Sequence, residues 1–266
     1  MPKPHFTNYH THTTRCHHAT GTEEEYIQTA LRNGYTVLGF SDHTPWKYAD
    51  PNFTSRIRML PDELEGYVST LSTLREKYAG QLHIHIGLEA EYFPAYLPWL
   101  KEEKERLGIE YLIFGCHYDT TDETGMYFGR PQSERDLRRY AEQVIEGLET
   151  GMYAYLAHPD ICLNRWTAYD KAAETTCREI CEAAARLDIP LEYNLAGLTC
   201  QNRGDGTLGY TTDFFWNIAA EYPVKAIIGC DAHAPEELDV TELFQRKREF
   251  LTGLGLTVLD TLPGLE

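Results

Sequence analysis

The 266-residue sequence has few basic side chains and no long apolar run. Lys and Arg together number 24 against 41 Asp and Glu, so the formal net charge is −17 with neutral histidines. Broad capture of nucleic acid needs Lys and Arg to replace the phosphate counterions, so we expect no nucleic-acid partner. No stretch is long enough to cross a bilayer, and the first residues lack the apolar core of a signal peptide. We therefore expect a cytoplasmic protein without a membrane partner.

The sequence also shows no sign of disulfide pairing or of a boundary between domains. The seven cysteines form no Cys-x-x-Cys pair, which indicates reduced thiols, most of them small apolar fillers. No repeat, low-complexity tract or linker interrupts the chain, and its composition is typical of globular proteins. We predict a single domain over residues 1–266, with Thr44–Leu60 as a long connection and a candidate lid. The sequence leaves the oligomeric state open.

Short β-type runs alternate with amphipathic helical runs along the whole chain. The predicted strands are Phe6–Thr11, Thr36–Ser41, Leu82–Glu89, Tyr111–Cys116, Tyr153–Ala157, Pro190–Asn194 and Ala226–Cys230. The predicted helices begin near Thr22, Pro61, Pro94, Ser133, Thr167, Thr211 and Pro235. Thr22 and Glu25 have the spacing of a capping box. Seven strands alternating with seven helices predict an α/β fold with a parallel sheet.

The positions of the chemically active residues favour a barrel over an open sheet. In a barrel the active residues gather at the carboxyl ends of all the strands, whereas an open sheet uses one crevice. Every predicted strand here ends in such residues, which are His10, His12, Asp42, His43, Glu89, His117, His158, Asn194, Asp231 and His233. We therefore predict a distorted, TIM-like (β/α)7 barrel.

These strand ends also predict a metal site. His10 and His12 lie two apart at a strand end, so both imidazoles can reach one ion. For this pair taken alone, the alternative to metal binding is that both histidines only form hydrogen bonds. Buried histidines and acids need partners, and so many at equivalent strand ends favour metal ligation.

Glu89 ends a strand whose aliphatic residues alternate with His83 and His85. A carboxylate at that position can bridge two ions about 3.5–4 Å apart. His83 and His85 lie deeper on the same face and are expected to be core histidines. His5 is expected to be solvated.

The ordered motifs resemble those of the polymerase and histidinol phosphatase (PHP) family. They are the run from His10 to His18, Ser41-Asp42-His43, Gly87-Leu88-Glu89, His117, His158-Pro159-Asp160 and Asp231-Ala232-His233. Within the family they are similar to the histidinol-phosphate phosphatase branch. The resemblance covers almost the whole chain and implies the PHP fold, a distorted barrel of seven βα units.

The resemblance also implies a trinuclear site. The first ion would be held by His10, His12, Glu89 and Asp231, and the second by Glu89, His117 and His158. The third would be held by His18, His43 and His233. His18 matches the family's ligand position, whereas His17 stands where a proline is usual. Nitrogen and oxygen ligands suit three divalent ions of zinc, manganese or iron.

The resemblance implies hydrolysis of L-histidinol phosphate, a step of histidine biosynthesis, by a metal-bridging hydroxide. Glu89 and Asp231 would hold the catalytic ions. Asp42 would orient an imidazole, ligate directly or donate a proton to the leaving group, a role that metal-bound water could also fill. Arg165 and Arg203 are candidates for binding the phosphate, with Arg15 a weaker one. The candidates for contacting the amino group and imidazole are Glu91, Tyr92, Glu192 and Tyr118.

Three other functions fit some of these features. A PHP phosphoesterase could act on nucleotides, phosphotyrosine, DNA ends or other small phosphoesters. A metal-dependent amidohydrolase also uses a His-x-His motif, but it usually bridges its metals with a modified lysine, and no lysine occurs at these strand ends. A non-catalytic metal-binding scaffold tends to have lost ligands, whereas this chain keeps all nine. Phosphomonoester hydrolysis is therefore the favoured function.

Overall fold

The computed structural model describes residues 6–50 and 52–265, and the chain divides into two compact units. The first unit comprises Met1–Ile113, Cys230–Leu243 and Asp260–Glu266, and the second comprises Phe114–Gly229 and Phe244–Leu259. Two elements cross a boundary between the units, the strand β4 (Tyr111–Phe114) and the helix α7 (Thr241–Gly253). The single domain over residues 1–266 stays a prediction.

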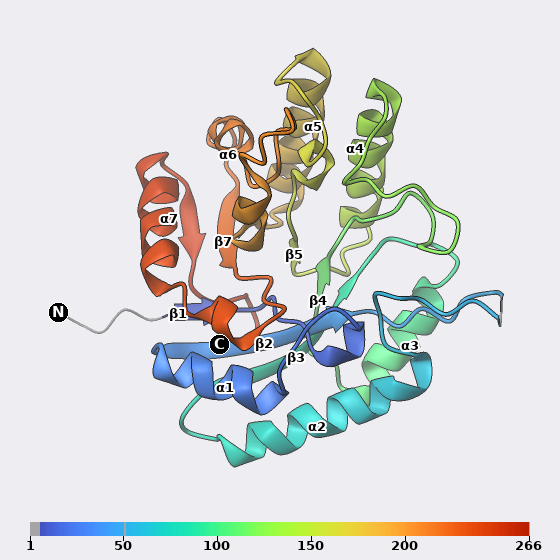
Figure 1. The fold of residues 1–266 in the computed structure, drawn as a ribbon, viewed down its shortest axis with the longest axis vertical. Coiled ribbons are helices and arrows are strands. Elements are labelled where there is room, and N and C mark those ends of the chain that lie inside the picture. The colour runs from blue at the N-terminus through green and yellow to red at the C-terminus, as the bar shows by residue number, and fades with distance from the viewer. Residues whose placement is uncertain (1–5, 51, 266) are drawn as a thin grey trace. The chain divides into compact units, whose positions relative to one another are not determined.

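The first unit is built on parallel strands covered by helices. Its strands are β1 (Phe6–Asn8), β2 (Tyr35–His43) and β3 (His83–Ala90), paired in that order. Its helices are α1 (Glu23–Arg32), α2 (Leu64–Lys77) and α3 (Leu97–Leu107), with short 3-10 turns at Thr14–Cys16, Pro61–Glu63 and Pro235–Leu238. Figure 1 shows α1 and α2 along β2 and β3, where α1 packs on β2 and α2 on β3. The register pairs His43 with Glu89, so both side chains leave the sheet at one level.

Local sequence signals account for much of this unit. Thr22 and Glu25 form the predicted capping box at the start of α1. The close packing of β3 depends on Gly87, because a Cβ there would lie 2.5 Å from the ring of Tyr111. The Tyr111 hydroxyl donates to the carbonyl oxygen of Tyr9 at 2.8 Å, which fixes that ring in the core. Glycine at position 87 thus lets the aromatic ring pack directly against the strand.

The second unit repeats the alternation of strand and helix. Its strands are β5 (Tyr155–Leu156), β6 (Leu191–Asn194), β7 (Lys225–Gly229) and β8 (Thr257–Leu259), all parallel and paired in that order. Its helices are α4 (Glu134–Leu148), α5 (Lys171–Leu187) and α6 (Asp213–Ala219), with 3-10 turns at Ile161–Leu163 and Ala196–Cys200. In Figure 1, α4 and α5 lie side by side, and these two helices pack together.

The predicted strands and helices are all present, and one strand was missed. β8 has only three residues, of which Thr257 is exposed and the other two are half-buried, so it carries no apolar signal. All seven cysteines are free, and six of them are buried. Among the described residues, no helix is long and apolar enough to span a membrane.

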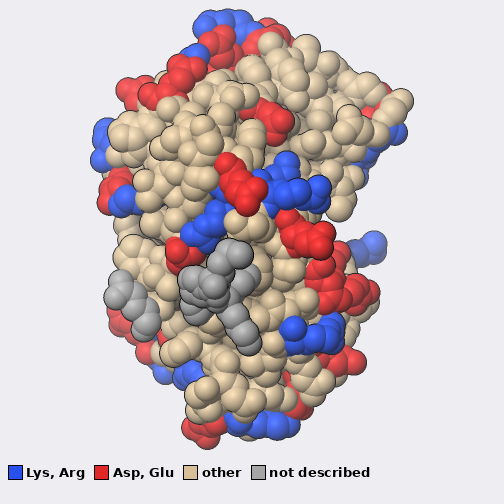
Figure 2. All heavy atoms as spheres, turned by 90° about the vertical axis from the view of Figure 1, so that its left-hand side faces the viewer, with Lys and Arg blue, Asp and Glu red and all other residues tan. Residues whose placement is uncertain are grey.

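Charged side chains of both signs are interspersed on the face drawn in Figure 2. Several exposed acids are paired with bases within a unit, as Arg32 is with Asp239 at 3.1 Å and Arg178 with Glu221 at 2.7 Å. Exposed pairs of this kind contribute at most about 1 kcal/mol each. Acidic and basic side chains therefore occur near one another on this face.

Candidate metal centre

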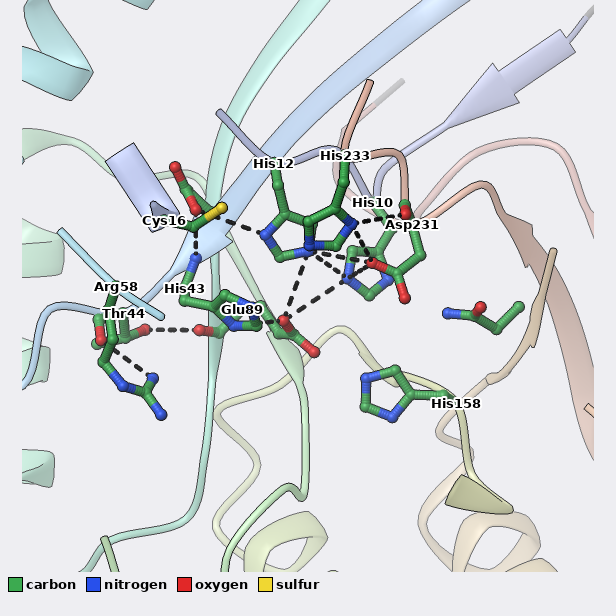
Figure 3. A network of polar contacts seen from close by, with 12 residues as sticks. His10, His12, Cys16, His43, Thr44, Arg58, Glu89, His158, Asp231 and His233 are labelled. Atoms are coloured by element: carbon green, nitrogen blue, oxygen red, sulfur yellow. Dashed lines mark hydrogen bonds and ion pairs between the residues drawn. The ribbon is translucent and has the colours of Figure 1, made fainter. Parts of the chain in front are cut away.

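The segment that follows β1 is held between β2 and the segment that follows β7. The His12 amide donates to the Ala232 carbonyl at 2.9 Å, and the Ala232 amide donates to the His10 carbonyl at 3.2 Å. On the other side the Ser41 amide donates to Thr11 at 2.9 Å. These backbone bonds direct the side chains of His10 and His12 towards Asp231, as Figure 3 shows.

The side chain of Asn8 holds the segments after β1 and β7 in place, a role that was not predicted from the sequence. Its side chain is fully buried. Its oxygen accepts from the amides of Cys230 at 2.8 Å and His10 at 3.3 Å. Its nitrogen donates to the His10 carbonyl at 3.0 Å and to Thr11 Oγ1 at 2.8 Å. One amide side chain therefore sets the spacing between the two segments that carry candidate ligands.

Four buried side chains converge with geometry that fits a cation. The Nε2 atoms of His10 and His12 are 3.1 Å apart, and each lies 3.7 Å from Glu89 Oε2. Asp231 Oδ1 lies 3.3 Å from His10 Nε2 and 3.1 Å from His12 Nε2. Ligands about 2.0–2.1 Å from a tetrahedral zinc ion are about 3.3 Å from one another. The observed distances of 3.1–3.7 Å scatter around that value, so this donor set suits a divalent ion.

The protonation behaviour of the cluster also favours a bound cation. Burial alone would raise the pKa of Asp231, but His10 and His12 hold it well below its ordinary value. Burial alone would lower the pKa of His12, yet Asp231 and Asp42 raise it to about 9. The pKa of His233 is lowered to about 3 by burial and by His12. Ionised carboxylates thus draw positive charge into the cluster, while His233 is in the neutral form that binds metals.

A second set of imidazoles adjoins the first. The rings of His12 and His233 stack at 4.0 Å, and ligand atoms of His12, His43 and His233 all lie within 4.8 Å of one another. His43 Nδ1 is 2.8 Å from Glu89 Oε2. The ring of His18, at the exposed rim, lies 4.7 Å from that of His233 and 5.4 Å from that of His43. The structure therefore brings together His18, His43 and His233, the three side chains assigned to one ion.

Backbone carbonyls orient two of these imidazoles. His18 Nδ1 lies 2.7 Å from the Cys16 carbonyl, and His233 Nδ1 lies 3.0 Å from the Asp231 carbonyl. A proton on each Nδ1 would satisfy these carbonyls and leave Nε2 with a lone pair for an ion. His17, in contrast, is exposed and has a left-handed backbone at the end of the Thr14–Cys16 turn.

Asp42 lies behind the imidazole of His12. It is fully buried and accepts hydrogen bonds from the Thr13 amide at 3.2 Å, the Thr13 hydroxyl and the His43 amide at 2.9 Å. Its Oδ1 is 3.5 Å from His12 Nδ1. Burial alone would raise the pKa of Asp42, but contacts with His12 lower it. This placement favours the orienting role among the alternatives for Asp42.

The second unit brings His117 and His158 together. Both are buried, and their ring centroids are 4.9 Å apart. The His158 backbone is left-handed, with φ of 31°, and its amide donates to Glu192 Oε2 at 3.0 Å. The same carboxylate oxygen accepts from Asn194 Nδ2 at 2.9 Å. Glu192 is fully buried and supports the chain at His158, so it is not an accessible substrate contact.

The candidate phosphate-binding arginines lie in neighbouring loops of the second unit. Arg165 is exposed and pairs with Asp205 at 2.5 Å. Arg203 donates to the Asn164 side chain at 2.6 Å and to its carbonyl at 3.3 Å. The contacts are reciprocal, because each arginine reaches into the loop that carries the other.

The weaker candidate Arg15 pairs with Glu23 and lies 3.3 Å from Thr70 Oγ1. The remaining histidines lie apart from the donor cluster. His83 is exposed at the start of β3, so the expected core position was wrong, because the first residue of the strand is not covered. His85 is half-buried and lies 3.1 Å from Glu110. His5 lies outside the described residues.

Comparisons with known proteins show which family the chain resembles. The family model for the PHP domain matches residues 8–196. The chain is 28% identical to the probable histidinol-phosphatase of Deinococcus radiodurans over 86% of each chain. It is 33% identical to the histidinol-phosphatase of Bacillus subtilis over 42% of this chain and 44% of that one.

A solved structure shares the fold over nearly the full length. It is the histidinol phosphate phosphatase of Lactococcus lactis in complex with zinc, L-histidinol and phosphate. The match covers 98% of both chains with a TM-score of 0.71 and 17% sequence identity. This likeness confirms the predicted PHP fold.

Proposed function

The chain belongs to the PHP domain family, and from this membership we propose that it is a metal-dependent histidinol-phosphatase. The reaction is hydrolysis of L-histidinol phosphate to L-histidinol and phosphate. The observation that carries the proposal is the buried donor set of His10, His12, Glu89 and Asp231, whose spacing fits a divalent ion. The names of the relatives support the choice of substrate.

We further propose three ions, with the assignments implied by the sequence. His10, His12, Glu89 and Asp231 would hold one, and His18, His43 and His233 another. That His117 and His158 hold a third with Glu89 stays a prediction. Bound divalent ions supply positive charge for the phosphoryl oxygens and lower the pKa of water. Zinc, manganese and iron all suit the nitrogen and oxygen donors.

The protein's own side chains have separate tasks in this proposal. Asp42 holds the His12 imidazole in the orientation that presents Nε2. Arg165 and Arg203 bind the phosphate through charge-assisted hydrogen bonds, for which Arg165 must exchange its contact with Asp205. Tyr92 and Tyr118 are half-buried and remain candidates for contacting the organic part of the substrate.

The test is phosphate release by purified protein supplied with Zn²⁺ or Mn²⁺. We expect kcat/KM for L-histidinol phosphate to exceed that for nucleoside monophosphates, phosphotyrosine and 4-nitrophenyl phosphate by at least about tenfold, equivalent to about 1.4 kcal/mol. Equal turnover of the whole panel would contradict the substrate assignment. No turnover of any ester by the metal-loaded protein would contradict the enzyme assignment.

A matched pair of variants tests the metal centre. Glu89→Gln removes a buried candidate ligand, and Glu102→Gln makes the same change at an exposed position in α3. We expect Glu89→Gln to abolish turnover and lower the metal content, while Glu102→Gln behaves as the wild type. Fewer than two ions per wild-type chain under metal-replete conditions would contradict the trinuclear site.

A further inference from the structure

A buried ion pair joins the Thr44–Leu60 connection to the end of β3. Arg58 and Glu91 are each 1% exposed. Arg58 Nη1 donates to Glu91 Oε2 at 3.0 Å, and Nη2 donates to Oε1 at 2.6 Å. The indole nitrogen of Trp46 donates to Glu91 Oε2 at 2.8 Å. The connection, described apart from residue 51, is therefore anchored at positions 46 and 58, which argues against its expected use as a free lid.

The same network reaches the backbone of Glu89. Arg58 Nη1 also lies 3.3 Å from the Thr44 carbonyl oxygen. The Thr44 amide and hydroxyl both donate to the Glu89 carbonyl, at 2.8 and 2.9 Å. Figure 3 shows Arg58 and Thr44 beside His43 and Glu89. Thr44 directly follows His43, and Glu91 lies two residues beyond Glu89, so the pair braces both segments that carry these candidate ligands.

A buried ion pair of this kind specifies geometry more than it adds stability. Its surroundings are partly apolar, with the Trp46 ring 5.3 Å from Phe93 and 6.1 Å from Tyr96. Replacing a buried ion pair by well-packed apolar residues often leaves stability unchanged or raises it. A bidentate contact between a guanidinium and a carboxylate instead fixes the relative orientation of the two chain segments.

Both oxygens of Glu91 already accept hydrogen bonds, so Glu91 is not an accessible acid for the amino group or imidazole of a substrate. The buried carboxylate acts inside the protein, on Arg58 and Trp46.

We propose that Arg58 and Glu91 are positioning residues for the metal centre. They hold the end of β3 and the segment after β2 at the separation that lets Glu89 and His43 bind ions. The inference rests on the proposed function only in taking these two side chains as ligands. Loosening the pair should weaken metal binding more than it weakens the fold.

The experiment compares the double variant Arg58→Met/Glu91→Leu with the wild type. Urea unfolding of the metal-free protein reports stability, and competition with a chelator reports the affinity for Zn²⁺ alone. We expect the unfolding midpoint to fall modestly, because the buried Trp46 indole nitrogen and the Thr44 carbonyl each lose a partner. We expect the Zn²⁺ affinity to fall more, by about 10–100-fold, as for other residues that support ligands. The control Arg106→Met/Glu65→Leu removes an exposed ion pair of the same unit and should leave Zn²⁺ affinity unchanged.

A stable double variant with wild-type Zn²⁺ affinity would overturn the proposal. Arg58→Lys provides the second route should the double variant not fold. Lysine keeps the charge but cannot form the bidentate contact with Glu91, so the Zn²⁺ affinity should still fall. Unchanged affinity in this variant would also overturn the proposal. Because the readout is metal affinity, a wild type that binds Zn²⁺ without hydrolysing L-histidinol phosphate would refute the proposed function and leave this inference standing.

Discussion

Replacing Asn8 by alanine tests how the metal centre is built. The Asn8 side chain is fully buried and makes four hydrogen bonds within the first unit. The shortest bonds link it to the Cys230 amide and to Thr11 Oγ1, both at 2.8 Å. The first of these ties β1 to the segment that carries Asp231. Asn8→Ala removes the tie and leaves the surrounding chain unchanged in sequence.

The magnitude follows from the groups that lose their partners. The His10 carbonyl keeps its bond from the Ala232 amide at 3.2 Å, so it contributes little. The bond from the His10 amide is long, at 3.3 Å, and is expected to be weak. The Cys230 amide and the Thr11 hydroxyl lose good partners, and each such loss costs about 1–3 kcal/mol when buried. We expect the free energy of unfolding to fall by about 3 kcal/mol.

Two measurements check this prediction. Urea unfolding of the metal-free protein at neutral pH gives the change in stability, and chelator competition gives the Zn²⁺ affinity, which should fall because Asp231 loses its fixed distance from His10. Asn217→Ala is the control, since Asn217 is exposed in α6 and its side chain donates to the Asp213 carbonyl of the same helix. That change should stay within about 0.5 kcal/mol. An Asn8→Ala variant with wild-type stability and Zn²⁺ affinity would refute the reasoning.

Three other changes test separate parts of the molecule. Gly87→Ala places a Cβ 2.5 Å from the buried Tyr111 ring, so urea unfolding should show a loss of about 1–3 kcal/mol, and no loss would mean that the ring moves freely. Burial alone would raise the pKa of Glu110, but the bond with His85 lowers it. Ionised Glu110 therefore stabilises the fold above pH 4.5, and this stabilisation is lost as the pH falls through the lowered pKa. The stability difference between wild type and Glu110→Gln should accordingly shrink below pH 4.5, and a constant difference would contradict this assignment. Arg165→Ala should raise KM for L-histidinol phosphate about tenfold without changing metal content, and a loss of metal would contradict a phosphate-binding role.

The fold was predictable wherever the signal is local. A capping box spans four residues, and the apolar runs of β2, β3 and β7 stand out against polar neighbours. β8 gave no such signal, because its three residues are only partly covered and it forms by pairing with a strand more than 30 positions earlier. How far an edge strand is buried depends on the rest of the fold, and the periodicity of the sequence carries no information about that.

The candidate ligands were predictable for the same local reason, and their supports were not. Each predicted ligand except His18 stands at or just beyond the end of an apolar run, which a sequence displays directly. His18 was assigned only through the resemblance to the PHP family. Asn8 contacts a residue 222 positions away, and Arg58 contacts one 33 positions away. Such partners become visible only when the fold brings them together. His83 was misplaced because alternation gives the face of a strand but not how far along the strand the core begins.

The structure changes the prediction of which side chains contact the organic part of the substrate. Among the four candidates for contacting the amino group and imidazole, the two acids Glu91 and Glu192 are buried and hold the chain beside candidate ligands. Tyr92 and Tyr118 are half-buried and keep part of their surface accessible. Aromatic rings bind an imidazole by stacking and an ammonium group through the ring face. Discrimination for L-histidinol phosphate should therefore rest on these rings more than on a carboxylate.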